Sequence, residues 1–403
     1  MTNLMKRILI VLPEPPFPLR AQGISIRYFP IIQHLFKKAT IDIVLISNST
    51  CDIDCQKNIK HYCEDIIHIK RPTNDNVNII RKTLKRIGFF LPWTLPRSWT
   101  DYDNRATINE LHDFIKNKFY SCVICVSGYN YPYIMSISAH KTIVDFIDSP
   151  SVLSDRNVIG SNRSILIRKY EAWKTARWEA KIIKQTDSSI YISNHDASYV
   201  ASDKASVNKR YVIPNGFSVD DFTFECIDTS TNKPSIGFLG NMSYYPNVEA
   251  VIWLYHEVFL KIKQTIPDLT LYIIGRSPDS SLLKLVGDDV IVTGDVDNIW
   301  PYVNKVDIFV FPILRGAGMK NKILEAMYAE KPVITSSIGN EGIDAVNHEQ
   351  LIICKSGDDY IKSIINLFEN PKLRQSIGHN ASKYAKEKFN WDTILKELDK
   401  IIP

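Results

Sequence analysis

The side chains best suited to chemistry lie in the segment VDIFVFPILRGAGMKNKILEAMYAEKPVITSSIGNEGI, residues 306–343. Gly316 and Gly318 interrupt it, Lys320 and Lys322 add two cations, and Glu325 follows about one helical turn later. Glycines let backbone amides approach a ligand, lysines attract anions, and a carboxylate accepts hydrogen bonds from sugar or ribose hydroxyls. These residue types in this order favour a site for a nucleoside diphosphate.

The apolar pattern indicates which elements position these residues. We expect a buried strand over 306–311, a loop containing Arg315, a helix over 320–329 and a further strand over 332–336. Loop amides and a helix N-terminus at the carboxyl edge of a parallel sheet suit a phosphate. The alternative is an ordinary crossover, in which the glycines serve only the turn and the lysines are solvated.

Length and charge indicate two domains and an anionic partner. The chain has 403 residues, 45% of them hydrophobic, which is enough for two cores. It contains no apolar run of the roughly 20 residues that span a bilayer. Residues 1–212 hold 30 Lys and Arg against 19 Asp and Glu, a net charge of +11, whereas 213–403 carry a net charge of −6. The basic half favours a membrane surface, a lipid-linked phosphate or a nucleic acid.

The seven cysteines give no sign of a metal or redox centre. Cys122 and Cys125 spell CxxC, but they lie in an expected strand that would place their sulfurs on opposite faces. The histidines show no metal-binding spacing such as HExxH. We therefore expect reduced thiols, no metal and a cytoplasmic location.

Strand and helix patterns alternate through both halves of the chain, which predicts parallel sheets covered by helices. Strands are expected over 8–12, 41–46, 66–69, 123–126, 142–146 and 189–192, and then over 236–239, 269–274, 290–292, 308–311, 333–335 and 351–353. The turn at 214–216 marks the domain boundary. We expect one Rossmann-like domain over 1–212, joined by a C-terminal helix from about 385 to 403, and a second over 213–384.

The first strand of the second half ends in a further glycine loop, FLGNMSYYPN. Gly240 would let a phosphate or another backbone approach, and Asn247 would cap a helix that begins at Val248. A well-capped crossover without a ligand is the alternative.

These motifs together resemble family 4 glycosyltransferases. The similar features are PNG (214–216), FLGNMSYYPN (238–247), YIIG (272–275), VTGDV (292–296), KNKILEAM (320–327), KPVITS (331–336) and FNW (389–391). The resemblance implies an α/β protein of the GT-B fold, with two facing Rossmann-like domains, a central cleft and a C-terminal helix that crosses back to the first domain. It also implies a retaining transferase that uses a nucleotide sugar and needs no metal or other cofactor.

The resemblance assigns donor contacts residue by residue. Glu325 matches the acidic residue that holds the ribose, residues 316–320 match the turn around the sugar and diphosphate, and Gly23 matches a loop glycine that approaches from the other domain. The implied donor-binding residues are Gly23, Gly240, Asn241, Arg315, Gly316, Ala317, Gly318, Met319, Lys320, Asn321 and Glu325.

Two departures concern the donor. Ala317 stands where many members carry a second glutamate, so that backbone amides or other side chains must contact the donor sugar. Asn241 replaces an arginine of the diphosphate clamp, and Tyr245 and Pro246 stand near the place of its lysine. We expect Lys320 and Lys322, assisted by Arg315, to supply the missing positive charge and to act in catalysis.

A third departure concerns the first domain, where some members place a histidine after a strand that faces the donor. Here the segment VDFIDSPS puts Asp145 and Asp148 at the strand end, where we expect both to face the cleft. Asp148 could orient the acceptor or the sugar. A carboxylate that caps the next segment or pairs with Arg156 is the alternative.

The sequence thus predicts a hexose-type glycosyltransferase acting on a glycan or lipid-linked glycan in surface polysaccharide assembly. A basic, apolar and aromatic stretch over 78–99 suggests peripheral contact with the inner face of a membrane, although a core-facing helix fits it as well. The alternatives are a GT-B nucleotide-sugar epimerase or hydrolase and a non-enzymatic nucleotide-binding protein. No nucleic-acid-binding module is recognisable, so that no nucleic acid is expected.

Overall fold

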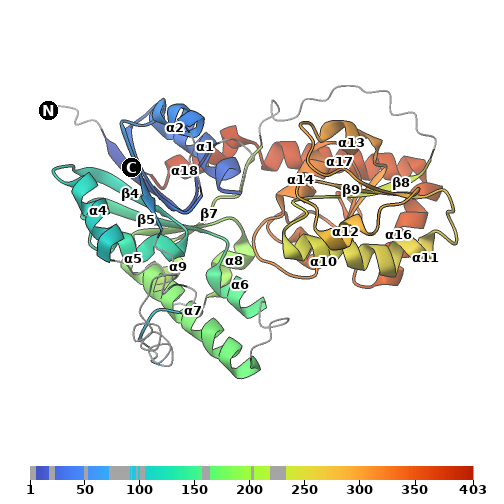
Figure 1. Ribbon diagram of the computed structural model, residues 1–403, viewed down its shortest axis with the longest axis horizontal. Coiled ribbons are helices and arrows are strands. Elements are labelled where there is room, and N and C mark those ends of the chain that lie inside the picture. Colours follow the sequence, from blue (N-terminus) through green and yellow to red (C-terminus); the bar gives the residue numbers. More distant parts are fainter. Residues whose placement is uncertain are drawn as a thin grey trace. The chain divides into compact units, whose positions relative to one another are not determined.

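The computed structural model describes residues 6–17, 23–49, 53–71, 91, 93–96, 99, 105–156, 164–200, 204–217 and 233–402. The chain divides into two compact units (Figure 1). The first comprises Met1–Asn215 and Trp391–Pro403, and the second comprises Gly216–Asn390. These limits lie a few residues from the boundaries expected at 212 and about 385.

The described residues of the first unit form a parallel sheet of seven strands in the order β3-β2-β1-β4-β5-β6-β7. Its strands are β1 (Arg7–Leu12), β2 (Thr40–Ser47), β3 (Asp65–Lys70), β4 (Tyr120–Val126), β5 (Ala139–Ile147), β6 (Ser188–Tyr191) and β7 (Arg210–Val212). The helices are α1 (Gly23–Phe36), α2 (Ile53–Lys60), α4 (Arg105–Ile115), α5 (Tyr131–Ile134), α6 (Pro150–Arg156), α7 (Ile165–Gln185), α8 (Asn194–Tyr199), α9 (Lys204–Val207) and α18 (Trp391–Asp399), with a 3-10 turn η3 (Gly128–Asn130).

Strand side chains alternate between two hydrophobic layers. Ile8 and Ile10 of β1 face a layer built with α1, α2 and α18, whereas Leu9 and Val11 face a layer built with α4, α5 and α7. Because both faces are covered, the strands read as continuous apolar runs. The sulfurs of β4 obey the same alternation, since Cys122 belongs to the first layer and Cys125 to the second. The expected placement of these two thiols on opposite faces is confirmed.

The C-terminal helix belongs to the first unit. Trp391, Ile394 and Leu398 of α18 are at most 5% exposed and join the hydrophobic layer of α1. Asp399 accepts hydrogen bonds or ion pairs from His34 and Lys38 of α1. Figure 1 shows α18 among the N-terminal elements of this unit. The return of the chain end to the first domain is therefore confirmed.

The described residues of the second unit form a parallel sheet of six strands in the order β10-β9-β8-β11-β12-β13. Its strands are β8 (Ser235–Leu239), β9 (Thr270–Ile274), β10 (Val290–Val292), β11 (Ile308–Phe311), β12 (Val333–Thr335) and β13 (Ile352–Ile353). The helices are α10 (Tyr245–Leu254), α11 (Leu260–Ile262), α12 (Ser280–Leu283), α13 (Trp300–Lys305), α14 (Asn321–Tyr328), α15 (Ser337–Asn340), α16 (Gly357–Glu369) and α17 (Pro371–Lys388), with a π-helical turn η5 (Tyr255–Phe259).

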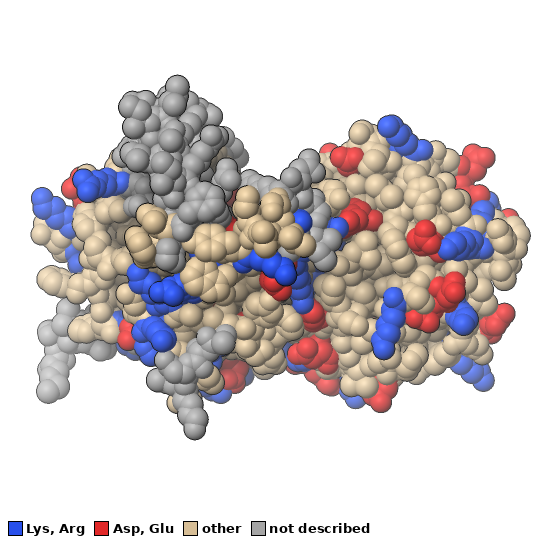
Figure 2. Space-filling model, turned by 90° about the horizontal axis from the view of Figure 1, so that it is seen from below, with Lys and Arg blue, Asp and Glu red and all other residues tan. Residues whose placement is uncertain are grey.

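Both sheets have the strand order of Rossmann-like domains. In the second unit, α13, α14 and α17 lie on one face of the sheet, and α10, α11 and α16 lie on the other (Figure 1). The predicted α/β class with two parallel sheets is confirmed. On the face shown in Figure 2, Lys and Arg side chains of this unit are interspersed with Asp and Glu.

Two local expectations are wrong. Gly23 is the first residue of α1 and not part of a loop, although residues 18–22 just before it lie outside the described residues. Asn247 does not cap a helix, because α10 begins two residues earlier, at Tyr245, and Asn247 lies in its first turn. Most of the predicted interfacial segment 78–99 also lies outside the described residues.

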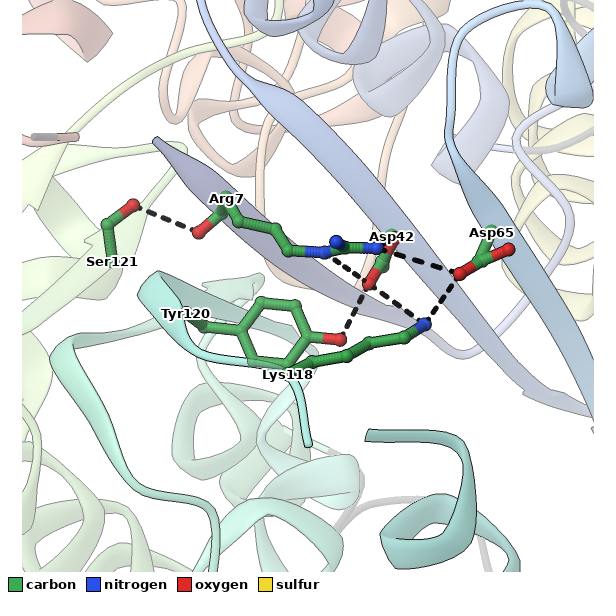
Figure 3. A network of polar contacts seen from close by, with 6 residues as sticks. All are labelled: Arg7, Asp42, Asp65, Lys118, Tyr120 and Ser121. Carbon is green, nitrogen blue, oxygen red and sulfur yellow. Dashed lines mark hydrogen bonds and ion pairs between the residues drawn. The ribbon is translucent and has the colours of Figure 1, made fainter. Parts of the chain in front are cut away.

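A network of charges joins four strands at the amino edge of the first sheet (Figure 3). Two guanidinium nitrogens of Arg7 donate to the two oxygens of Asp42, each at 2.9 Å, and the hydroxyl of Tyr120 donates to Asp42 at 2.7 Å. The amino group of Lys118 lies 3.3 Å from Asp42 and 2.7 Å from Asp65. Asp42 is fully buried, and its burial is offset by three donors.

We predict that Asp42→Asn lowers the unfolding free energy of the first unit by about 3 kcal/mol, because Arg7 and Lys118 lose their buried counter-charge. Hydrogen exchange of peptides from β1 to β4 measures the change. Glu397→Gln, which removes an exposed pair with Lys400, serves as the control and should have little effect. Equal hydrogen exchange in Asp42→Asn and Glu397→Gln would contradict the predicted contribution of the network to stability.

The same network predicts acid sensitivity. Burial alone would raise the pKa of Asp42, but hydrogen bonds from Arg7 and Tyr120 and the charge of Lys118 outweigh it and hold the pKa below its usual value. A carboxyl group with a lowered pKa stabilises the fold above its unfolded pKa, and this contribution is lost as pH falls. The difference in stability between wild type and Asp42→Asn should therefore shrink below about pH 4.

Candidate functional site

The second sheet has a topological switch point between β8 and β11. These strands are neighbours, but the chain moves from β8 to one side of the sheet and from β11 to the other. Because every pair in the sheet is parallel, the loops after both strands emerge at the same edge. Doubly wound domains bind ligands in the crevice that such diverging loops leave.

The loops that follow β8 and β9 touch through their backbones. A Cβ atom on Gly275 would lie 1.7 Å from the carbonyl oxygen of Gly240, so that no side chain fits there. The amide of Gly240 donates to Ile274, and that of Met242 donates to Arg276, each at 3.0 Å. Glycine at 275 thus fixes the position of the Gly240 loop.

The loop between β11 and α14 is shaped by two glycines and Lys320. Gly316 and Gly318 have φ angles of 118° and 68°, which strain other residue types. The amino group of Lys320 donates to the carbonyl of Ala317 at 2.8 Å and to that of Gly318 at 2.5 Å. In a trans peptide the N–H points opposite to the C=O, so the amides of Gly318 and Met319 face away from this lysine.

Arg315 also bonds within the unit. One guanidinium nitrogen lies 2.5 Å from Glu249 of α10, and the guanidinium carbon lies 5.7 Å from the ring centre of Tyr245. Arg315 therefore ties the loop to α10, and Lys320 stiffens the loop itself. Of the three cations expected at the site, Arg315 and Lys320 thus bond to Glu249 and to the loop carbonyls, whereas Lys322 makes different contacts.

Lys322 lies at the switch point without an ion pair among the described residues. Its amino group donates to the side-chain oxygen of Asn247 and stands 4.9 Å from the ring centre of Phe238. The residue as a whole is partly exposed, whereas its amino group is buried. Burial, reinforced by the charge of Lys320 and partly offset by Glu325, lowers the pKa of Lys322 to about 7.

The remaining residues predicted to bind the donor belong to the same loop and helix as this lysine. Glu325 is half-buried, three residues after Lys322 on α14, and Asn321 is the first residue of that helix. Ala317 and Met319 are buried, at 9% and 7% exposure. The structure thus gathers the residues predicted from Gly240 to Glu325 at one edge of one sheet.

Asn241 and Asn247 connect the two glycine loops. The side-chain oxygen of Asn241 accepts hydrogen bonds from the amide and hydroxyl of Ser243, at 3.0 and 2.8 Å, and shapes its own turn. The side-chain nitrogen of Asn247 donates to the Asn241 carbonyl at 2.8 Å, while its oxygen accepts from Lys322. The sequence analysis predicted only a helix-capping role for Asn247.

In the first unit, the structure separates Asp145 from Asp148. Asp145 is wholly buried and accepts hydrogen bonds from Arg27 at 2.8 Å and from Tyr28 at 2.7 Å. The expectation that it faces a cleft is wrong, because this carboxylate neutralises a buried guanidinium. Asp148 is partly exposed, in the turn between β5 and α6.

The turn that carries Asp148 is held from both sides. Ile147 has a φ of 64°, an unusual value for a β-branched residue, and its amide donates to Asp145 at 2.9 Å. The buried carboxylate of Glu179 accepts hydrogen bonds from Ser149, from the amide and hydroxyl of Ser151, and from Tyr191. Sequence reasoning missed Glu179, since its partners lie on other elements.

Gly23 lies at the start of α1, where a Cβ atom would meet no heavy atom within 4 Å. Packing therefore does not require glycine at this position. Within the described ranges, no three His, Cys, Asp or Glu side chains gather as they would around a metal ion. No helix among the described residues is long and apolar enough to cross a bilayer.

Residues 233–370 match the model of the family described as Glycosyl transferases group 1, and this range includes all donor-side residues of the second unit. An uncharacterized 44.6 kDa protein from the cps region of Klebsiella pneumoniae is 22% identical over 98% of this chain and 100% of its own length. The capsular polysaccharide biosynthesis glycosyltransferase CapM of Staphylococcus aureus is 30% identical over 35% of this chain and 34% of its own.

Solved structures of similar fold span nearly the whole chain. Sucrose-phosphate synthase from Thermosynechococcus elongatus aligns with a TM-score of 0.70 at 16% identity, over 98% of both chains. HepE of Anabaena, solved with UDP and glucose, aligns with a TM-score of 0.66 at 12% identity, over 98% of this chain and 99% of its own.

Two Rossmann-like units, with glycine loops at the switch point of the second, define a protein of the GT-B class. The family model covers the unit that carries those loops, and full-length structural neighbours share the fold. Residues 233–370 match the glycosyltransferases of group 1, and together with the relatives this match supports a glycosyltransferase of the family 4 type. The expected GT-B fold is confirmed, and the expected family agrees with this match.

The surroundings of Lys322 predict a stability that depends on pH. Folding lowers its pKa from 10.5 to about 7, so between these values the unfolded chain binds more protons than the folded one. The unfolding free energy then rises with pH in this window, by at most about 1.4 kcal/mol per pH unit for this group. Lys322→Met should remove that slope and stabilise the second unit at pH 7 and below.

Urea unfolding of wild type and Lys322→Met from pH 6 to 10 measures this difference. Lys331→Met serves as the comparison, because burial also lowers the pKa of Lys331, whose amino group donates to the Asn304 carbonyl at 2.8 Å, so this variant shows the slope that a buried lysine away from the glycine loops contributes. If the unfolding free energies of wild type and Lys322→Met change with pH in parallel over this range, the lowered pKa of Lys322 is contradicted.

Proposed function

We propose that the protein is a retaining, metal-independent glycosyltransferase of the hexose type, which uses a nucleoside-diphosphate sugar and a glycan or lipid-linked glycan acceptor. The observation that carries the donor assignment is Lys322, whose amino group lies beside two glycine loops and has no carboxylate partner in the described part of the chain. Burying a cation without an ion pair destabilises the fold. An anionic ligand at this point would offset that cost.

The neighbours support the chemistry of both substrates. HepE was solved with UDP and glucose, which supports a nucleotide-sugar donor. CapM acts in capsular polysaccharide biosynthesis, and the Klebsiella relative is encoded in a cps region, which supports an acceptor in surface polysaccharide assembly. The excess of Lys and Arg over 1–212 supports peripheral contact with the inner face of a membrane.

In the proposed reaction the bond between the sugar C1 and the diphosphate oxygen breaks, and C1 bonds to an acceptor hydroxyl oxygen on the same face. The acceptor proton passes to the departing phosphate. Negative charge grows on that phosphate in the transition state, and Lys322 stabilises it there. Glu325 accepts hydrogen bonds from the ribose hydroxyls, and the amides of Gly318 and Met319 donate to the sugar or diphosphate.

A donor screen tests the proposal. In a screen of UDP-, GDP-, ADP- and CMP-sugars, we expect one of the three diphosphate sugars, and not the monophosphate CMP-sugar, to raise the melting temperature of wild type, because binding stabilises the folded state. Lys322→Met should lose most of this shift and about 100-fold in turnover, whereas Lys331→Met should retain both. Lys320→Ala, which loosens the loop, should lose less than Lys322→Met. Full donor affinity and turnover in Lys322→Met would remove it from the site.

Product analysis separates the alternative enzymes. Incubation of the stabilising donor without acceptor should leave it largely intact, whereas an epimerase or hydrolase would convert it. A donor that is consumed equally with and without added glycan would contradict a transferase.

Asp148 is the proposed polar group on the acceptor side. Its side chain is partly exposed in a turn that Asp145 and Glu179 hold, and its proposed role is to orient an acceptor hydroxyl. Asp148→Asn should lower kcat about 10- to 100-fold and leave the donor-induced thermal shift unchanged. Asp155→Asn, seven residues later on α6, serves as the control and should leave kcat unchanged. A kcat equal to wild type would exclude Asp148 from the mechanism.

A further inference from the structure

Asn247 is the residue that determines how Lys322 is presented. It is 5% exposed in the first turn of α10, and both ends of its amide are bonded. The nitrogen donates to the Asn241 carbonyl at 2.8 Å, which leaves the oxygen facing Lys322. The orientation of the amide is therefore fixed by the β8 loop.

The steric fit at Gly240 links the same groups. A Cβ atom at Gly240 would lie 2.9 Å from the side-chain nitrogen of Asn247 and 3.5 Å from the Cδ atom of Lys322. Asn247 therefore occupies the space that a side chain at 240 would need, and Lys322 would stand in ordinary contact with that side chain. Two segments 75 residues apart meet here, each held by the other.

An amide oxygen and a carboxylate would have opposite consequences at this position. Either can orient an ammonium group, but a carboxylate also neutralises its charge and would repel a phosphate. The amide accepts one hydrogen bond and leaves the positive charge and two further N–H donors of Lys322 for a ligand. The residue type is thus suited to holding a cation for an incoming anion.

Resting on the proposed donor site, we propose that Asn247 is a positioning residue that holds Lys322 toward the donor's diphosphate, in place of the clamp that Asn241 and Pro246 no longer provide. Lys322 then acts as the main phosphate-binding cation of the second unit. Arg315 and Lys320 play supporting parts, since they already bond to Glu249 and to the loop carbonyls.

The charges around Lys322 make this arrangement sensitive to protons. Lys320 lowers its pKa and Glu325 raises it, while α10 and β8 contribute the neutral Asn247 and the apolar Phe238. With a pKa of about 7, most of these amino groups are neutral at pH 8 in the empty protein. A bound diphosphate favours the charged form, so binding at pH 8 should take up close to one proton.

Isothermal titration calorimetry with UDP, GDP and ADP tests this at pH 8. Titration in two buffers of different ionisation enthalpy gives the number of protons taken up, and the terminal phosphate is already ionised at this pH. Wild type should take up a proton with at least one of the three, and its affinity should fall as pH rises from 7 to 9. Asn247→Asp, nearly identical in size, should abolish the proton uptake, flatten the pH profile and weaken binding more than 10-fold.

Two further variants keep the result interpretable. Asn247→Leu removes the hydrogen bond without adding charge, so it should weaken binding about 10-fold but still take up a proton. Lys331→Met should bind and take up protons as wild type does. Circular dichroism and thermal melts confirm that each variant is folded.

The outcomes separate this inference from the proposed function. If Lys322→Met binds poorly while Asn247→Asp keeps the proton uptake and pH profile of wild type, the role of Asn247 is overturned and the donor site stands. If Lys322→Met binds all three nucleotides as wild type does, or none binds to wild type, the donor site and the inference both fail.

Discussion

An ammonium group held without a counter-charge is the constraint on which the donor side of this protein depends. Removing a cation from water is costly, and Lys322 recovers only one amide hydrogen bond and the face of Phe238. Gly240 leaves room for Asn247, which bonds this group, and Gly275 leaves room for Gly240. Packing around Asn247 therefore favours both glycines, in addition to any direct approach to a ligand.

Other buried ionisable groups in the protein have several bonding partners. Asp145 is matched by Arg27, Asp42 by Arg7 and Lys118, and Glu179 by four hydrogen-bond donors. Each of these groups lies between elements of the first unit and fixes their positions. Lys322 has no opposite charge paired with it among the described residues, and one amide oxygen and one aromatic face meet it at the switch point. In the proposed function, the diphosphate of the donor supplies the missing charge.

The sequence predicted the elements well because they depend on local patterns. The apolar runs at 290–292, 308–311 and 333–335 coincide with β10, β11 and β12, since strands covered on both faces have no polar side to obscure them. Cys122 and Cys125 fell on opposite faces for the same reason, because strand side chains alternate regardless of tertiary context.

Side-chain partners could not be predicted in this way, because they come from distant segments. Asp145 and Arg27 are 118 residues apart, and Arg315 and Glu249 are 66 apart, so no local pattern indicated that either charge was already paired. Asn247 was misread as a cap because asparagine is common before helices. Its partner, Lys322, lies on the other side of the switch point, which only the strand order reveals.

The alanine at 317 becomes intelligible from the loop around it. A glutamate at this position would accept hydrogen bonds from sugar hydroxyls. Here the carbonyls of Ala317 and Gly318 instead accept hydrogen bonds from Lys320, so the amides of Gly318 and Met319 point away from that lysine. These amides can donate hydrogen bonds, whereas a carboxylate can only accept them. If the donor sugar lies at this loop, as proposed, its oxygens are recognised as acceptors by a backbone that two glycines and one lysine hold in place. Lys320 then contributes to recognition through the loop's shape, while the charge on the diphosphate is left to Lys322.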